Sequence, residues 1–241
     1  MSDLSGRVAV VTGGVSNLGA AIVGAFSAAG AEVVIADLDD RPRGEGAVGH
    51  VIRTDISSAD DVDRLVSETV ERFGRIDYLV NNAAVWHRRP VAEITPEEWD
   101  RVLGINLRGP FLCSRAVAPV MKDQGGGVII NIGSQAGAFY TRGQGAHYQV
   151  SKAAVSHLAR VLAFEFGPMN IRVNCVAPGL LRGDSTEPMS PPMVSFLDQT
   201  PLGRFATHAD VAAACLFFVS DAAAAVTGQT LLVNGGALAY L

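Results

Sequence analysis

The sequence predicts an α/β fold: one doubly wound parallel sheet of about seven strands, with helices on both faces. Three observations support this prediction. Short apolar runs of the buried-strand type alternate with helical patterns along the whole chain. A glycine-rich turn joins the first of these runs to the first helix. No internal repeat, linker or composition break divides the 241 residues, so we expect a single domain over residues 1–241.

The composition is that of a globular chain with a large core. Apolar residues make up 49% and charged residues 18%, which excludes a disordered chain. The formal net charge is −5 and no Lys/Arg-rich run occurs, so we expect no nucleic-acid partner. The chain begins without an apolar signal region, and its longest apolar run, residues 211–219, is too short to span a membrane. These features predict a cytoplasmic protein without a membrane partner.

Cysteine and histidine usage argues against metal binding and disulfides. Cys113, Cys175 and Cys215 are odd in number and far apart, so we expect buried, reduced side chains. The five histidines are scattered, and no His, Cys or carboxylate pair has metal-ligand spacing. We expect no metal.

The first forty residues predict a βαβ unit that binds a dinucleotide. A strand over residues 7–12 leads into the turn 13–19, an alanine-rich helix follows, and a second strand ends at Asp37. Glycines let the backbone approach a pyrophosphate, and the helix N-terminus offers free N–H groups. The Asp37 carboxylate can accept hydrogen bonds from both ribose hydroxyls and would repel a 2′-phosphate, which favours NAD over NADP. The glycines alone would also fit an ordinary turn.

Two further strands should bring polar or small residues to the same edge of the sheet. A brief strand over residues 50–54 precedes Asp55, which could bind an adenine amino group or belong to a helix cap with Ser57 or Ser58. An amphipathic helix follows over residues 60–73, and Gly74 ends it. A strand over residues 76–80 then ends in small residues, which allow a ligand to approach or form a plain turn.

The next predicted helix begins at Pro96 with Thr95 as its N-cap and continues through Phe111 towards Met121. Asn106 lies in its middle among apolar residues. A buried amide must find hydrogen-bond partners. From this residue alone, a capping or kink-filling role and a functional role fit equally well.

A serine, a tyrosine and a lysine follow the fifth strand, residues 128–132. Ser134 comes just past its carboxyl end, where open α/β sheets place chemistry. A helix over residues 147–166 then carries Tyr148 and Lys152, four residues apart on one face. Lys152 is one of only two lysines beside 17 arginines. The spacing alone also fits a solvated helix turn.

The remaining elements are a sixth strand over residues 171–177 that Pro178 and Gly179 break, a helix over residues 209–219 and a strand over residues 230–233. Between them, residues 183–200 mix prolines with methionine, phenylalanine and leucine. We expect a mobile lid over an apolar substrate there; an ordinary pair of surface helices is the alternative.

In these motifs the chain resembles the short-chain dehydrogenase/reductase family in its single-domain branch, with a Rossmann-like sheet. The resemblance covers nearly the whole length and rests on Thr12-Gly13-Gly14, Leu18-Gly19, Asp37, Asp55, Asn81-Asn82-Ala83, Asn106, Ser134, Tyr148, Lys152 and Pro178-Gly179. It implies a catalytic tetrad of Asn106, Ser134, Tyr148 and Lys152. It also implies NAD contacts from Gly13, Ser16, Asn17, Leu18, Gly19, Asp37, Asp55, Ile56, Asn82, Ala83, Ala84, Tyr148, Lys152, Pro178, Gly179 and Leu181.

The tetrad implies an acid/base mechanism. Tyrosine has a pKa near 10, and the Lys152 ammonium should lower that pKa so that Tyr148 exchanges the alcohol proton. Lys152 would also hold the nicotinamide ribose. Ser134 would orient the substrate oxygen, and Asn106 would hold a water that links Lys152 to solvent.

Three positions depart from the family pattern. Asn17 replaces a glycine, although asparagine tolerates positive φ. Ala84 replaces another glycine. Gly183 stands where the family often has a nicotinamide-contacting threonine, and either Ser185 or Thr186 could take over that contact.

These features predict an NAD-dependent oxidoreductase that interconverts a secondary alcohol and a ketone. Alternatives are an NADP-dependent carbonyl reductase and a non-catalytic dinucleotide-binding regulatory protein. An apolar or cyclic substrate should contact Trp86, Phe139, Tyr140, His147, Met189 and Met193, although Trp86 and Phe139 could equally be packing residues. The resemblance also implies a homotetramer, with the helices around Phe111 and Val161 as candidate interfaces.

Overall fold

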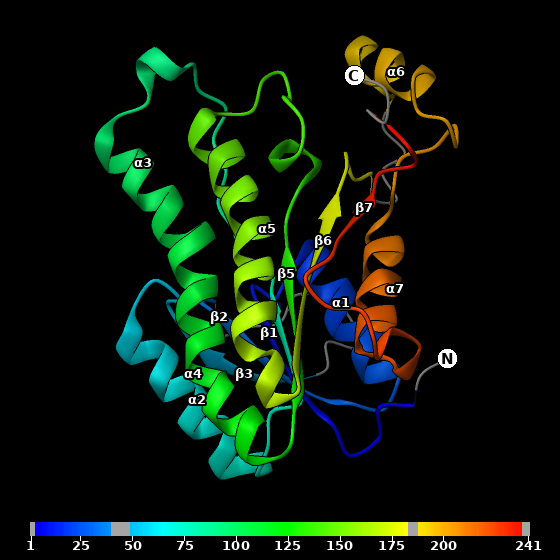
Figure 1. Ribbon diagram of the computed structural model, residues 1–241. Coiled ribbons are helices and arrows are strands. Elements are labelled where there is room, and N and C mark those ends of the chain that lie inside the picture. The colour runs from blue at the N-terminus through cyan, green and yellow to red at the C-terminus, as the bar shows by residue number, and fades with distance from the viewer. Residues whose placement is uncertain (1–2, 40–48, 183–187, 238–241) are drawn as a thin grey trace.

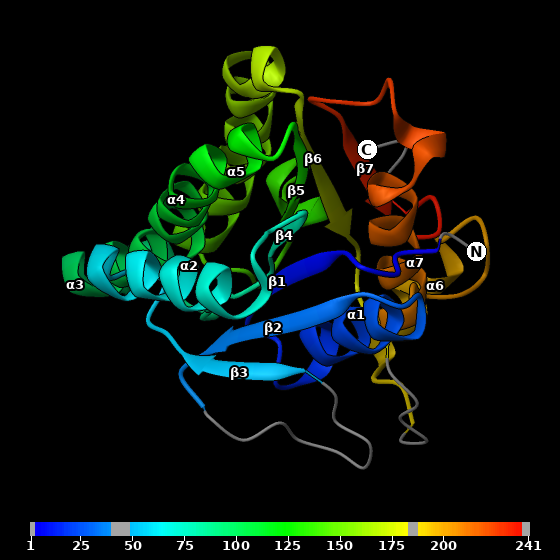
Figure 2. The same ribbon diagram turned by 90° about the horizontal axis from the view of Figure 1, so that it is seen from below.

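The computed structural model describes residues 3–39, 49–182 and 188–237. Its core is a parallel sheet with helices packed around it (Figure 1). The sheet has seven strands in the order β3-β2-β1-β4-β5-β6-β7, which can be followed in Figure 2, and every neighbouring pair is parallel. The strands are β1 Val8–Thr12, β2 Glu32–Asp37, β3 His50–Arg53, β4 Tyr78–Asn81, β5 Gly127–Ile132, β6 Ile171–Pro178 and β7 Thr230–Val233. The prediction of a Rossmann-like parallel sheet of about seven strands is confirmed.

Helices cover both faces of this sheet. They are α1 Asn17–Ala28, α2 Ala59–Phe73, α3 Pro96–Leu103, α4 Gly109–Asp123, α5 Ala146–Phe166, α6 Pro191–Asp198 and α7 His208–Val219. Figure 2 shows α1 and α7 on one face and α2, α4 and α5 on the other. Short 3₁₀ turns span Val91–Glu93, Gln135–Gly137, Gly167–Met169 and Asp221–Ala223.

Two hydrophobic cores result because alternate strand residues point to opposite faces. In β1, Ala9 and Val11 pack with α1 and α7, whereas Val8 and Val10 pack with α2, α4 and α5. All five residues of β1 are buried, which explains its continuous apolar sequence. The three cysteines are also buried and free, as expected.

The local signals at helix ends are confirmed. Ser58 accepts a hydrogen bond from Asp61 N at 3.3 Å, so it is the cap of α2. Thr95 accepts one from Glu98 N at 3.2 Å and caps α3. Gly74 ends α2 with a φ of 74°, a left-handed conformation that suits glycine.

The long helix predicted from Pro96 towards Met121 differs in one respect. A π-helical turn, Gly104–Arg108, separates α3 from α4 and contains Asn106. A π-turn adds one residue to the helical repeat and is frequent at functional sites. Among the described residues, no helix has the length and apolar character that a membrane crossing needs.

The strand order predicts a crevice at the carboxyl ends of the central strands. Strand connections run outward from β1 through β2 to β3, and in the opposite direction from β4 through β5 to β6. Open α/β sheets bind ligands beyond the carboxyl ends of their strands where the order reverses, here between β1 and β4.

Candidate active site

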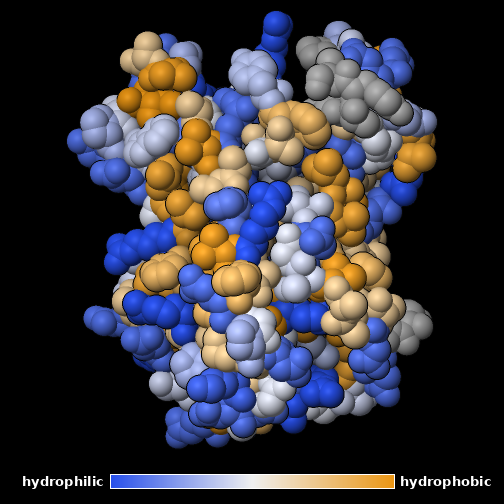
Figure 3. Space-filling view, viewed as in Figure 1, coloured by the Kyte–Doolittle hydropathy of each residue, from blue (hydrophilic) through white to orange (hydrophobic). Residues whose placement is uncertain are grey.

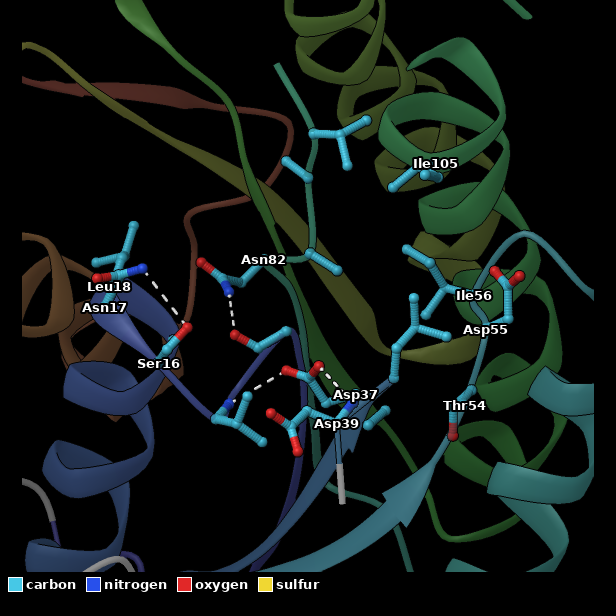
Figure 4. A pocket seen from close by; sticks show the side chains of 18 residues that line it. Ser16, Asn17, Leu18, Asp37, Asp39, Thr54, Asp55, Ile56, Asn82 and Ile105 are labelled. Atoms are coloured by element: carbon cyan, nitrogen blue, oxygen red, sulfur yellow. Dashed lines mark hydrogen bonds between the residues drawn. The ribbon is translucent and has the colours of Figure 1, made fainter. Parts of the chain in front are cut away.

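A cavity of about 440 Å³ lies at this reversal (Figure 4). Eleven of the predicted cofactor residues line it: Gly13, Ser16, Asn17, Leu18, Gly19, Asp37, Asp55, Ile56, Asn82, Ala83 and Ala84. Seven further lining residues were not predicted: Val15, Ala36, Leu38, Asp39, Thr54, Val85 and Ile105. Five of them adjoin a predicted cofactor residue in the sequence, so adjacency was the signal that could have found them. Ile105 adjoins the predicted catalytic residue Asn106, and Asp39 comes two residues after Asp37.

The glycine turn is shaped to admit a ligand backbone. Gly13 has a φ of 66°, and a Cβ there would lie 2.8 Å from the Cα of Ala83. A Cβ on Gly19 would overlap the Gly13 carbonyl oxygen. Asn17 has a φ of 51°, so asparagine does adopt the left-handed conformation expected at this substituted glycine position.

Asn82 braces this turn from the neighbouring strand. Its amide nitrogen donates to the carbonyl oxygens of Thr12, at 3.0 Å, and Gly13, at 2.9 Å. The Thr12 hydroxyl oxygen accepts from the backbone N–H groups of Asn82 and Ala83, both at 3.0 Å. Helix α1 has no acidic residue in its first turn, and the side chain of Ser16 does not cap it. Its first N–H groups are therefore suited to an anion such as a pyrophosphate.

Asp37 ends β2 at the cavity. Its carboxylate accepts from Val15 N at 3.3 Å and from Asp39 N at 3.2 Å. A carboxylate has about four acceptor sites, so capacity for ribose hydroxyls remains. The 18 lining residues, all in the described part of the chain, include Asp37, Asp39 and Asp55 and no lysine, arginine or histidine.

Both interpretations of Asp55 fit the structure. One carboxylate oxygen accepts from the backbone N–H and hydroxyl of Ser57, at 2.9 and 2.7 Å, which is a turn before α2. The residue also lines the cavity, beside Ile56.

Lys152 and Tyr148 face the same space beside Ser134. The ammonium nitrogen of Lys152 lies 5.8 Å from the centre of the Tyr148 ring and donates to the Ile132 carbonyl oxygen at 2.8 Å. Lys152 is buried, and burial lowers its pKa to about 8. The Ser134 oxygen accepts from Ala136 N at 3.1 Å.

The pKa of Tyr148 differs from our expectation. We expected the Lys152 ammonium to lower it, but burial raises it, and a hydrogen bond with the Ser134 side chain opposes this only in part. The physical reason is that a phenolate in a poorly solvated site is costly when no further positive charge is present.

Asn106 clamps the loop after β4. Its side chain accepts from Val85 N at 2.8 Å, and it donates to Val85 O at 2.9 Å and to the Ser151 hydroxyl at 3.1 Å. The three bonds satisfy this buried amide. The water link from Asn106 to Lys152 stays a prediction.

Three other predicted cofactor residues lie outside the cavity, at the end of β6. Pro178 ends the strand, and Gly179 donates to Val233 O at 3.0 Å. A Cβ on Gly179 would come within 2.5 Å of the Asn234 side chain, so close packing requires a glycine. Leu181 forms a bridge with Ala206. Gly183, Ser185 and Thr186 lie outside the described residues, as does the segment 183–187 of the predicted lid.

The predicted substrate residues divide into three groups. Trp86 and Tyr140 are 54% and 79% exposed, and Arg88 lies 5.4 Å from the Trp86 ring centre. Phe139, Met189 and Met193 are half-buried, with Met193 on α6. His147 does not lie where a substrate could touch it: its side chain is fully buried and turned towards Glu98.

The parallel sheet has a glycine cradle where its strand order reverses, and α5 carries a half-buried tyrosine next to a buried lysine. Together these features define a class, the oxidoreductases that use a dinucleotide. A family model described as enoyl-(acyl carrier protein) reductase matches residues 13–237. A 3-oxoacyl-[acyl-carrier-protein] reductase from Synechocystis sp. is 36% identical over 100% of both chains. A D-threitol dehydrogenase from Mycolicibacterium smegmatis is 35% identical over 97% of this chain and 93% of its own.

Solved structures agree. One from Burkholderia xenovorans, assigned to the short-chain dehydrogenases/reductases, superposes with a TM-score of 0.90 at 34% identity over 100% of both chains. The protein belongs to the short-chain dehydrogenase/reductase family and is an oxidoreductase that binds a nicotinamide dinucleotide.

Proposed function

We propose that the protein is an NAD-dependent oxidoreductase that interconverts a secondary alcohol and a ketone. The observation that carries the proposal is the group that follows β5 and begins α5: the amino group of the buried Lys152 lies 5.8 Å from the ring centre of the half-buried Tyr148, which forms a hydrogen bond with the Ser134 side chain. The glycine cradle fits the pyrophosphate, and the acidic end of the cavity fits an unphosphorylated ribose.

The nicotinamide ring supplies or accepts the hydride when the dinucleotide is bound. Tyr148 takes the hydroxyl proton during oxidation and returns it during reduction. Ser134 holds the substrate oxygen through its hydroxyl. Lys152 has two donors left after its bond to Ile132, which suit the ribose hydroxyls and the phenolate of Tyr148.

Asp37 supports the choice of NAD. The residue lines the cavity, so its carboxylate would repel the negative charge of a 2′-phosphate. The substrate is proposed to be apolar or cyclic because apolar side chains lie near the proposed site residues in the sequence and are accessible to solvent at least in part. These residues are Trp86, Phe139, Met189 and Met193.

A second candidate is the reduction of a 3-oxoacyl thioester. It is favoured by the names of several relatives, among them a second reductase, from Thermotoga maritima, that is 35% identical over 97% of this chain. That name and D-threitol dehydrogenase both denote exchange between a hydroxyl and a carbonyl group. The two candidates therefore share the acid/base chemistry and differ in the substrate and in the choice between NAD and NADP.

A substrate panel distinguishes the two. Cyclic, aromatic and linear secondary alcohols would be offered with NAD or NADP, and 3-oxoacyl thioesters with NADH or NADPH, while the absorbance of the reduced cofactor is followed. We expect turnover of alcohols with NAD. Turnover confined to the thioesters with NADPH would overturn the proposal in favour of the second candidate.

We further propose a homotetramer in the cytoplasm. Phe111 on α4 and Val161 and Phe164 on α5 are at least 40% exposed. Figure 3 shows apolar side chains among polar ones on the face that these helices form. Light scattering at several protein concentrations would give the mass, and a mass of one chain would contradict the proposed assembly.

A further inference from the structure

A polar cluster next to Tyr148 in the sequence contains one fully buried side chain and has no part in the proposed chemistry. It consists of His147 on α5, Glu98 on α3, and His87 and Arg89 on the loop between β4 and α3. The His147 side chain is 0% exposed. Within the described part of the chain its Nε2 atom has no hydrogen-bond partner. A fully buried polar atom without a partner calls for a physical explanation.

The surroundings of the ring define its orientation and tautomer. Nδ1 of His147 accepts from the backbone N–H of Tyr148 at 3.0 Å, an N–H that also reaches the Gly145 carbonyl oxygen at 3.1 Å. A ring nitrogen that accepts a hydrogen bond carries no proton, so this geometry places the proton of the ring on Nε2. Nε2 faces Glu98 Oε1 at 3.9 Å.

The same cluster joins three segments: the loop after β4, helix α3 and the start of α5. Arg89 Nε lies 3.1 Å from Glu98 Oε2, and His87 Nδ1 lies 4.0 Å from Glu98 Oε1. Gly145 N donates to His87 O at 3.2 Å. A Cβ on Gly145 would overlap the His147 ring, so the ring packs directly on the backbone that begins α5.

We propose that His147 is a positioning residue whose imidazole holds the first turn of α5, and with it Tyr148, against Glu98 of α3 and the loop at His87. The proposal rests on the proposed function, in which Tyr148 exchanges the proton. The N-cap residue of α5, Gly145, has no side chain to cap the helix, and the His147 ring supplies a side-chain acceptor for an N–H group of this turn. A misplacement of about 1 Å at a reacting group can cost roughly a hundredfold in rate.

Three substitutions separate the two contacts of the ring. Asparagine places its oxygen close to the position of Nδ1, glutamine places its amide nitrogen close to the position of Nε2, and alanine removes both. We expect kcat to fall at least about tenfold in His147→Ala and to recover in part in His147→Asn and His147→Gln. The dissociation constant of NADH should stay unchanged, since His147 does not line the cavity.

Glu98 provides the partner test. Glu98→Gln should lower kcat in the wild-type protein. In the His147→Ala background the same substitution should have little further effect, because the proposed role of Glu98 depends on its contact with His147. The matched control is Asp100→Asn, which removes an exposed carboxylate from the same helix and should leave kcat unchanged. Wild-type kcat in His147→Ala would overturn the proposal. A fall in kcat that comes with an equal loss of NADH affinity would also overturn it, because that is general structural damage.

A spectroscopic measurement judges the proposal without turnover. Two-bond ¹H–¹⁵N spectra of the full chain with ¹⁵N-labelled histidine report each tautomer, and His147→Ala identifies the signals of His147. We expect a proton on Nε2 and an unprotonated Nδ1. A proton on Nδ1 would overturn the proposal, whereas near-normal activity of Tyr148→Phe would overturn the proposed function alone.

Discussion

The ammonium nitrogen of Lys152 lies 2.8 Å from the carbonyl oxygen of Ile132 and is buried there. This bond joins α5 to the last residue of β5, two residues before Ser134. The lysine therefore ties together the two segments that carry the proposed acid/base and its partner hydroxyl. It also leaves a charge in a poorly solvated site, which has a measurable consequence.

The stability of the folded chain should depend on pH through Lys152. Burial lowers its pKa from 10.5 to about 8. Between these values the unfolded chain keeps a proton on this lysine that the folded chain has released, so stability rises with pH. Below pH 8 both states are protonated and the unfavourable contribution is constant.

Urea denaturation of the wild type and of Lys152→Met between pH 7 and 10.5 isolates this effect. As the pH rises across this window, the free energy of unfolding of the wild type should increase relative to that of the variant by up to about 3 kcal/mol. Parallel curves for the two proteins would contradict the assignment.

Asp37 should determine the choice of dinucleotide. Asp37→Ala removes a charged acceptor for the ribose hydroxyls and the repulsion against a 2′-phosphate. We expect NAD affinity to fall at least about tenfold, as for the loss of a charged hydrogen bond, while NADP affinity rises. Fluorescence titration with NADH and NADPH measures both. Glu32→Gln, at the other end of β2, is the control. An unchanged ratio of the two affinities would rule out this role.

The glycine at position 13 should be needed for two separable reasons, conformation and space. Gly13 and Gly74 have φ values of 66° and 74°, but a Cβ would meet Ala83 only at Gly13, whereas nothing lies within 4 Å of Gly74. Both alanine variants should lose about 1 kcal/mol of stability or more from the backbone strain. Only Gly13→Ala should also lose dinucleotide affinity. Equal affinity in the two variants would show that the cradle does not contact the dinucleotide.

The fold, and the position of the glycine turn and Asp37 at the cavity, were predictable because they rest on local rules. Strands buried on both faces read as apolar runs, and Ser58, Thr95 and Gly74 marked helix ends through their backbone preferences. Asp37 was recognised because its strand, turn and helix occur in sequence order. At these positions the local sequence was sufficient for the prediction, without knowledge of tertiary contacts.

Other features depend on contacts between distant segments. The burial of His147 follows from the approach of α3 and of the loop at His87, which the pattern around Tyr148 does not encode. The raised pKa of Tyr148 reflects burial by the assembled site. The π-turn at Asn106 depends on the Val85 backbone, which lies 21 residues away along the chain.

The last helix offers a stability test away from the site. Thr207 Oγ1 accepts from Asp210 N at 3.2 Å, and the Asp210 carboxylate accepts from Thr207 N at 2.8 Å, a reciprocal cap on α7. Thr207→Ala should lower the free energy of unfolding by about 1 kcal/mol without changing turnover. Ser67→Ala, which removes an exposed hydroxyl within α2, should have a much smaller effect. Equal effects in urea denaturation would argue against the cap.

The most direct measurement is the turnover of Tyr148→Phe beside its affinity for NADH. The substitution removes only the phenolic hydroxyl. Tyr78→Phe removes the phenolic hydroxyl of another tyrosine, in β4, and serves as the control. We expect Tyr148→Phe to lose at least about a hundredfold in kcat, the usual contribution of a general acid/base, while NADH binds as in the wild type. Near-normal turnover in Tyr148→Phe would contradict the account of this site.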